Sequence, residues 1–207
     1  MFIGRTRQVH VMAKSRSDLI LRDRMQFDVD ASGDVATLYG RIDLSDYVSI
    51  PKSEGLKIKE VRFQVRDTKE PTTGSFNQLL NRNATTATFS SLKLYSTTTA
   101  YETAVDVGIG SPNVINVVEH QCYTHVIENG SGTNVGGNTL ISYFEYGVPD
   151  LHPDGFPVVT DLLIGVAGEN MTAYQGETLE LDIMLIAEPV KLTKDDMEQM
   201  LTQATDL

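Results

Sequence analysis

The feature that most constrains the fold is an alternation of apolar and polar residues that recurs between residues 25 and 190. It is clearest near the end of this region, where apolar side chains occupy every second position: Leu179, Leu181, Ile183 and Leu185. Residues two apart in a β-strand point to the same face of its sheet. The pattern therefore predicts strands with one buried face.

Eight segments carry such strand signals, and several are separated by Gly, Pro, Asn or Asp. They span residues 25–30, 35–44, 56–67, 87–98, 113–129, 138–148, 156–168 and 177–190. Amphipathic helical patterns between them are mostly absent, although a parallel α/β sheet would need helices as crossovers. We therefore expect an all-β, antiparallel sandwich or barrel over residues 25–192. A phase slip between Ile58 and Val61 predicts a β-bulge.

The segment before this body, residues 1–24, is basic. It holds six Lys or Arg residues and two acids, whereas the whole chain has a formal net charge of −11. This asymmetry predicts an arm and a body that meet different partners. We expect four cations to contact nucleic-acid phosphates without sequence specificity, or another negatively charged partner: Arg5, Arg7, Lys14 and Arg16. The alternative is a solvated tail.

The segment after the body, residues 193–207, has a helical pattern. Thr193 is a suitable N-cap, and Asp196 follows three residues later. Met197, Met200, Leu201 and Ala204 lie at the spacing of one helix face. We expect Met197, Met200 and Leu201 to contact a neighbouring subunit, and the alternative is that the helix packs on its own domain.

Motifs that would indicate catalysis, a metal or a cofactor are missing. His120 and His125 are five residues apart on an expected strand and would face opposite sides, which does not suit a shared metal. Cys122 lies in an apolar stretch and is expected to be a small core residue. Asp150, His152 and Asp154 fit a turn containing Pro153 and Gly155. We expect no enzyme activity, no metal and no cofactor.

The arm "RTRQVHVMAKSRS", the strand series and the closing runs "FPVVTDLLIGVAG" and "ETLELDIMLIAEPV" together resemble a single jelly-roll capsid protein of a small icosahedral virus. The resemblance implies an eight-stranded jelly-roll sandwich that assembles with copies of itself around viral nucleic acid. It also implies location in the virion, assembly inside the host cell and no membrane span. The alternatives are a surface or carbohydrate-binding β-sandwich module and a cupin-like enzyme, although the scattered histidines do not match a cupin.

Overall fold

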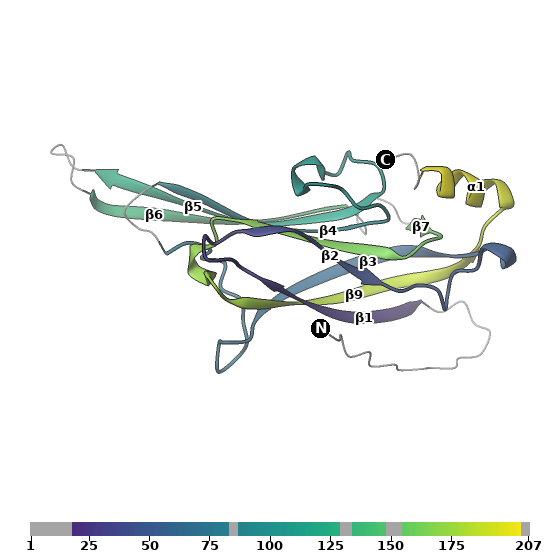
Figure 1. The fold of residues 1–207 in the computed structure, drawn as a ribbon, viewed down its shortest axis with the longest axis horizontal. Coiled ribbons are helices and arrows are strands. Elements are labelled where there is room, and N and C mark those ends of the chain that lie inside the picture. Colours follow the sequence, from purple (N-terminus) through teal and green to yellow (C-terminus); the bar gives the residue numbers. More distant parts are fainter. Residues whose placement is uncertain (1–17, 83–86, 129–133, 148–154, 204–207) are drawn as a thin grey trace.

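The computed structural model describes residues 18–82, 87–128, 134–147 and 155–203, and they form two antiparallel β-sheets packed face to face (Figure 1). The four-stranded sheet has the order β1-β9-β3-β7, and the five-stranded sheet has the order β2-β8-β4-β5-β6. The strands are β1 (Leu19–Asp28), β2 (Val35–Ile42), β3 (Glu54–Asp67), β4 (Thr88–Thr97), β5 (Val114–Glu128), β6 (Asn134–Gly147), β7 (Phe156–Val158), β8 (Leu162–Glu169) and β9 (Thr178–Lys191). Short 3-10 helices lie at η1 (Ile50–Lys52), η2 (Ala104–Asp106) and η3 (Thr172–Tyr174).

This strand order is that of a jelly roll, because most successive strands alternate between the two sheets. Eight strands make up that arrangement, and β6 extends the five-stranded sheet by one further strand beside β5. The predicted all-β, antiparallel jelly-roll sandwich is thus confirmed. Its strand β1 starts at Leu19 and so includes the last six residues of the segment that we assigned to the arm.

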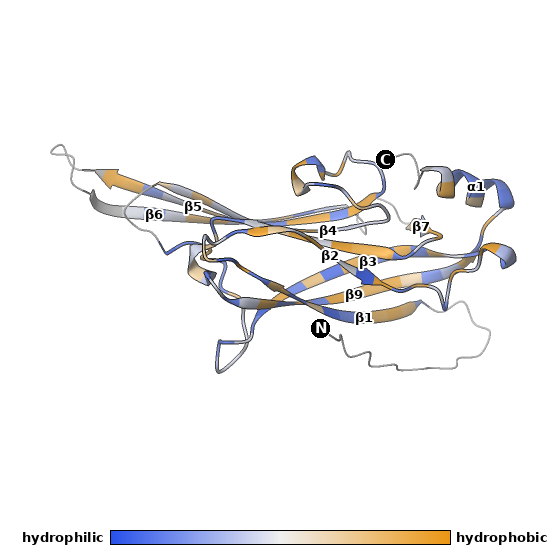
Figure 2. Ribbon diagram, viewed as in Figure 1, coloured by the Kyte–Doolittle hydropathy of each residue, from blue (hydrophilic) through white to orange (hydrophobic). Residues whose placement is uncertain are grey.

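The core lies between the sheets and follows the alternation in the sequence. Leu179, Leu181, Ile183 and Leu185 on β9 are at most 4% exposed, and Leu92 and Leu94 on β4 are fully buried. Figure 2 shows the apolar residues along β3, β4 and β9. Cys122 is also fully buried in this core, as expected. The predicted bulge is present as a register shift between Ile58 and Glu60, where β3 pairs with β9.

Residues 156–168 form two strands where the sequence predicted one. The first, β7, pairs with β3 in the four-stranded sheet, and β8 then pairs with β2 and β4 in the other sheet. The chain crosses between the sheets at residues 159–161. There the Asp161 carboxylate accepts a hydrogen bond from the Leu44 backbone N–H at 3.0 Å and forms an ion pair with Arg41. These contacts fix the crossing.

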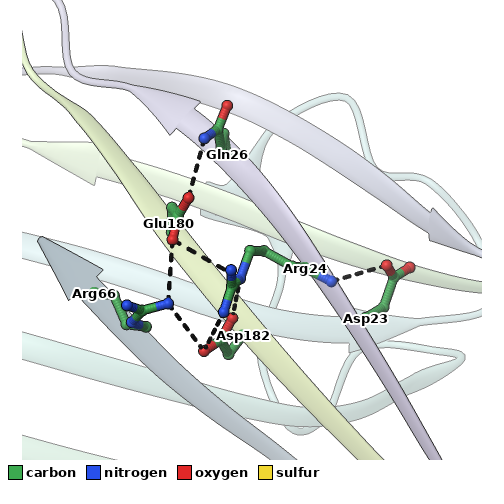
Figure 3. Close-up of polar contacts among 6 residues, drawn as sticks. All are labelled: Asp23, Arg24, Gln26, Arg66, Glu180 and Asp182. Carbon is green, nitrogen blue, oxygen red and sulfur yellow. Dashed lines mark hydrogen bonds and ion pairs between the residues drawn. The ribbon is translucent and has the colours of Figure 1, made fainter. Parts of the chain in front are cut away.

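The outer face of the four-stranded sheet carries a ladder of opposite charges (Figure 3). Arg24 on β1 donates to both oxygens of Asp182 on β9, at 2.5 and 3.2 Å. Arg66 on β3 lies 3.3 Å from Glu180, which also accepts a hydrogen bond from Gln26 at 3.1 Å. Cations of β1 and β3 therefore form ion pairs with acids of β9, which lies between these two strands.

The C-terminal helix α1 (Lys194–Gln203) lies at the end of the molecule opposite the end where β5 stops and β6 starts (Figure 1). Its predicted N-cap is confirmed, because the Thr193 hydroxyl accepts from the Asp196 N–H while the Asp196 carboxylate accepts from the Thr193 N–H. Met197 is 3% exposed within its own chain, whereas Met200 and Leu201 are half-buried. Within residues 18–82, 87–128, 134–147 and 155–203, no helix is long and apolar enough to span a membrane.

Candidate interaction surface

Strand β6 is the edge of the five-stranded sheet and carries exposed apolar side chains on both of its faces. Their exposed fractions range from 39% for Phe144 and Tyr146 to 64% for Leu140. Ile141 and Tyr143, at 43% and 48%, belong to the same set. Figure 1 shows β5 and β6 extending beyond the other strands at one end of the molecule, so this part of the sheet projects from the sandwich.

On the outer face, apolar side chains line up across three strands. Phe89 on β4 pairs with Tyr123 on β5, which pairs with Leu140 on β6. Phe144 and Tyr146 lie on the same face of β6, with ring centroids 6.1 Å apart and ring planes at 8°. We call these five residues the outer patch. Each of them is between 39% and 64% exposed.

On the inner face, Tyr143 of β6 begins a row of aromatic rings that leads into the sandwich. Its ring centroid lies 5.1 Å from that of His120, His120 lies 5.5 Å from Phe76, and Phe76 stacks on Tyr174 at 5.2 Å. The Tyr143 hydroxyl donates to Glu145 at 3.1 Å, and Glu145 pairs with Arg62 of β3 at the same distance. The inner face of β6 is therefore tied to its own domain, and the outer patch is not tied in this way.

The titratable groups of this row are held in their neutral forms by burial. Burial lowers the pKa of His120, and the His120 Nδ1 atom is buried without a hydrogen-bond partner. Burial also raises the pKa of Tyr174 to about 12, although its hydroxyl exchanges hydrogen bonds with the Asn77 backbone. A neutral, ring-packed His120 fits a packing role. His125 lies on the opposite face and is exposed, so the two histidines do not meet.

The connection at residues 97–112 covers the outer face of the five-stranded sheet beside the outer patch. Its anchor is the Tyr39 hydroxyl, which accepts from the Tyr95 hydroxyl at 2.8 Å and from the Tyr101 N–H at 2.8 Å. Tyr95 lies over Gly165, where an added Cβ would come 2.1 Å from its ring. Between this connection and β6 is an open pocket of about 280 Å³, lined by Gly108, Ile109, Val117, Glu119 and Tyr146.

The site residues expected from the sequence stand apart from this surface. Arg5, Arg7, Lys14 and Arg16 lie outside the described residues, as do Asp150, His152 and Asp154. Met197, Met200 and Leu201 lie on α1, and their contact with a neighbouring subunit remains a prediction. Within the described ranges, no three His, Cys, Asp or Glu side chains are grouped to hold a metal ion.

The outer patch was not foreseen. The segment "LISYFEY" was predicted to be a strand, and it is one, but nothing local shows that it lies at an edge. The signal that could have indicated a special position is its lack of alternation, since apolar residues occupy both faces. Such runs are usual in strands that are covered on both sides. Here each face of β6 is instead partly open to solvent.

No protein-family model and no curated protein sequence matches this chain. Among solved structures, the chain is similar to Merkel cell polyomavirus VP1, in a structure described as its complex with disialyllactose. The match has a TM-score of 0.38 and 7% sequence identity, and covers 88% of this chain and 98% of the other. A likeness of this degree supports no functional conclusion. The strand order by itself shows the jelly-roll fold.

Proposed function

We propose that this protein is a structural capsid subunit that assembles with copies of itself into a closed icosahedral shell around a genome. The observation that carries the proposal is the exposed apolar edge strand β6 on a jelly-roll sandwich. Unpaired backbone groups and exposed apolar residues along a long edge favour association with another chain. A protein that functions as a monomer would be expected to protect such an edge.

Two further considerations favour a shell over a simple dimer. Jelly rolls recur in the shells of viral capsids. Closed symmetric assemblies use several distinct contacts, each of which can be small. The chain offers two well-separated surfaces, the outer patch with β6 at one end and the exposed part of α1 at the other (Figure 1).

In a shell of this kind, the basic arm would lie on the inside and contact the genome. Arg5, Arg7, Lys14 and Arg16 neutralise nucleic-acid phosphates or another negatively charged partner inside the virion. With about four phosphates neutralised on a single strand, the logarithm of affinity should fall with the logarithm of salt concentration at a slope near −3. Deleting residues 1–16 should flatten this slope. Unchanged binding of mixed oligonucleotides after the deletion would show that the arm has another role.

The principal experiment measures the size of the purified protein. The mass of one chain is 22.8 kDa, and a shell should elute in the megadalton range and appear as closed particles in negative-stain micrographs. The variant Leu140→Asp/Phe144→Asp should abolish particles and keep the β-rich circular dichroism spectrum. Val105→Asp is the matched control, because Val105 is 88% exposed and outside the outer patch. A wild-type protein that stays monomeric over a range of salt and pH would contradict the proposal.

The role of α1 as a second contact is tested separately. Met200→Asp/Leu201→Asp changes two half-buried residues and leaves the buried Met197 in place. If α1 bridges subunits, particles should fail to form while the melting temperature of the monomer changes little. A large loss of monomer stability would show instead that α1 only covers its own domain.

Carbohydrate binding is a second candidate, favoured by the exposed rings of the outer patch. Tyr123, Phe144 and Tyr146 lie beside Gln121 and Ser142, so flat apolar surface and polar groups share one face. Aromatic side chains with a polar end suit such mixed contacts. A monomeric protein that binds glycans, and loses this binding in Tyr146→Ala, would favour this function over the shell.

A further inference from the structure

We infer that β6 pairs with β6 of a second copy, antiparallel and across a two-fold axis at Ser142, which joins the two five-stranded sheets into one. This inference rests on the proposed self-assembly and names the contact through which it begins. The partner at this edge is a second copy of this chain. The reasons are the state of the other edges, the register of the strand, its charge and its exposed area.

The other edges of the described sheets are protected, each in its own way. Edge strand β1 carries Arg22, Asp23 and Arg24 in succession, and charges discourage edge pairing. Edge strand β2 has a register irregularity between Val35 and Leu38. It also contacts the 97–112 connection, since the Ala104 N–H donates to Thr37.

The edge formed by β3 and β7 is paired at two places, and between them β3 carries the charged residues Lys59, Glu60 and Arg62. The short strand β7 covers the start of β3, and Ser75 forms a bridge with Arg66 near its end. By contrast, residues 138–147 of β6 contain no proline and a single charge, Glu145, which is engaged by Arg62 and Tyr143. Strand β6 therefore lacks the protection that the other described edges have.

The sequence of β6 is complementary to itself in one register. Residues directly opposite in an antiparallel pair share a face, so outer residues must meet outer residues and inner residues must meet inner ones. With Ser142 opposite itself, Leu140 meets Phe144 on the outer face and Ile141 meets Tyr143 on the inner face. Glu145 meets Thr139, so no like charges face each other. Every apolar residue from 140 to 144 thus has an apolar partner.

Neighbouring registers are poorer. With Tyr143 opposite itself, Ile141 would face Glu145 and Phe144 would face Ser142. With Ile141 opposite itself, Tyr143 would face Thr139 and Leu140 would face Ser142. Each alternative sets at least two apolar side chains against polar ones, whereas the Ser142 register does so only for Tyr146, which faces Asn138. The Ser142 register also brings the two outer patches together into one continuous surface.

The surface area that β6 could bury against a second copy is that of a small interface, one of several in an assembly. A Phe or Tyr side chain buries about 150–250 Å² when fully covered, and five β6 side chains that are roughly half exposed would contribute about 400–600 Å² per copy. The two copies together then bury about 800–1,200 Å², a range that lies at or below the lower end of specific interfaces, which is about 1,200 Å². Such a contact, supported by backbone hydrogen bonds, is adequate for a shell that has further contacts.

Disulfide trapping tests the register. In the proposed pairing the two Ser142 Cα atoms lie about 4.5–5.5 Å apart, within the range that a disulfide bridges. Asn138 is the matched control on the same face, because its two copies would be separated by eight residues, or about 27 Å. Ser142→Cys should give a covalent dimer under mild oxidation, and Asn138→Cys should not. The native Cys122 is fully buried, and the wild-type protein is the control for any cross-linking through it.

A mixture of Asn138→Cys and Tyr146→Cys chains should cross-link to each other, because these positions are opposite in the proposed register. Particles that form without a Ser142→Cys cross-link would overturn the inference and leave the proposed function standing. A Ser142→Cys dimer without particles in any condition would support the inference and count against the shell. Equal cross-linking of Ser142→Cys and Asn138→Cys alone would show that the register is wrong.

Discussion

The two faces of β6 should respond differently to truncation, because one face packs on its own domain and the other does not. Tyr143 is 48% exposed, so roughly half of its ring area, about 75–125 Å², is removed from water. At about 25 cal/mol per Å² this burial contributes about 2–3 kcal/mol. The ring contact with His120 adds about 0.5–1 kcal/mol. Tyr143→Ala should therefore lower the free energy of unfolding by about 2.5–4 kcal/mol.

Leu140 offers the contrasting case on the outer face. It is 64% exposed, so only about a third of the 1.5–3 kcal/mol available to a fully buried leucine is realised. Leu140→Ala should thus cost less than about 1 kcal/mol in the monomer. The substitution should instead weaken assembly, because Leu140 becomes buried when two copies associate. Tyr143→Phe removes only the exposed hydrogen bond to Glu145 and should also cost less than about 1 kcal/mol.

The assay is urea unfolding followed by circular dichroism, at a concentration low enough to keep the protein monomeric, because association would itself stabilise the fold. For a chain of this length the Tyr143→Ala penalty corresponds to a fall in melting temperature of about 5–15 °C. The slope of the unfolding curve should not change. Equal penalties for Tyr143→Ala and Leu140→Ala would refute the assignment of the two faces.

Three further predictions concern other parts of the fold. Because burial lowers the pKa of His120 below 6.5, the unfolded chain takes up its proton first, so the free energy of unfolding should fall as pH drops below 6.5 and level off below the folded pKa. His120→Phe should remove that part of the pH dependence in pH-dependent urea titrations, and His125→Phe should keep it. Gly165→Ala should destabilise the protein by about 3 kcal/mol, because the new methyl group meets the Tyr95 ring, and melting curves that match the wild type would contradict this. Thr193→Ala should cost about 1 kcal/mol and speed hydrogen exchange within residues 194–203, while exchange in β9 stays slow.

The fold could be predicted from the sequence wherever burial is one-sided. Strand β9 alternates because one face meets the core and the other meets solvent, and its buried residues are those that the pattern indicated. The bulge in β3 was visible for the same reason, since an extra residue shifts the alternation. The cap of α1 was visible because Thr193 and Asp196 interact over three residues.

Features set by contacts between distant residues could not be predicted in this way. Residues 156–168 read as one apolar strand, and the crossing at Asp161 depends on Leu44 and Arg41, which are far away in sequence. Strand β6 is an edge because no other strand of the described residues pairs with its side away from β5, and no local pattern encodes this. The outer patch was missed because its residues are separated in sequence and come together only through the register of β4, β5 and β6.

The central place of β9 in its sheet has a consequence for how the protein is made. Strands β1 and β3 both pair with β9, which is the last strand of the described sheets and ends at Lys191. After β3 leaves the ribosome, about 120 further residues must be added before its main partner is complete, or roughly 6–25 seconds at ordinary rates of synthesis. Until then the four-stranded sheet cannot form, and the core residues of the five-stranded sheet have no opposite sheet to pack against. The pairing partners β1 and β3 therefore stay without β9 through most of the synthesis of this domain, and the four-stranded sheet forms late in folding.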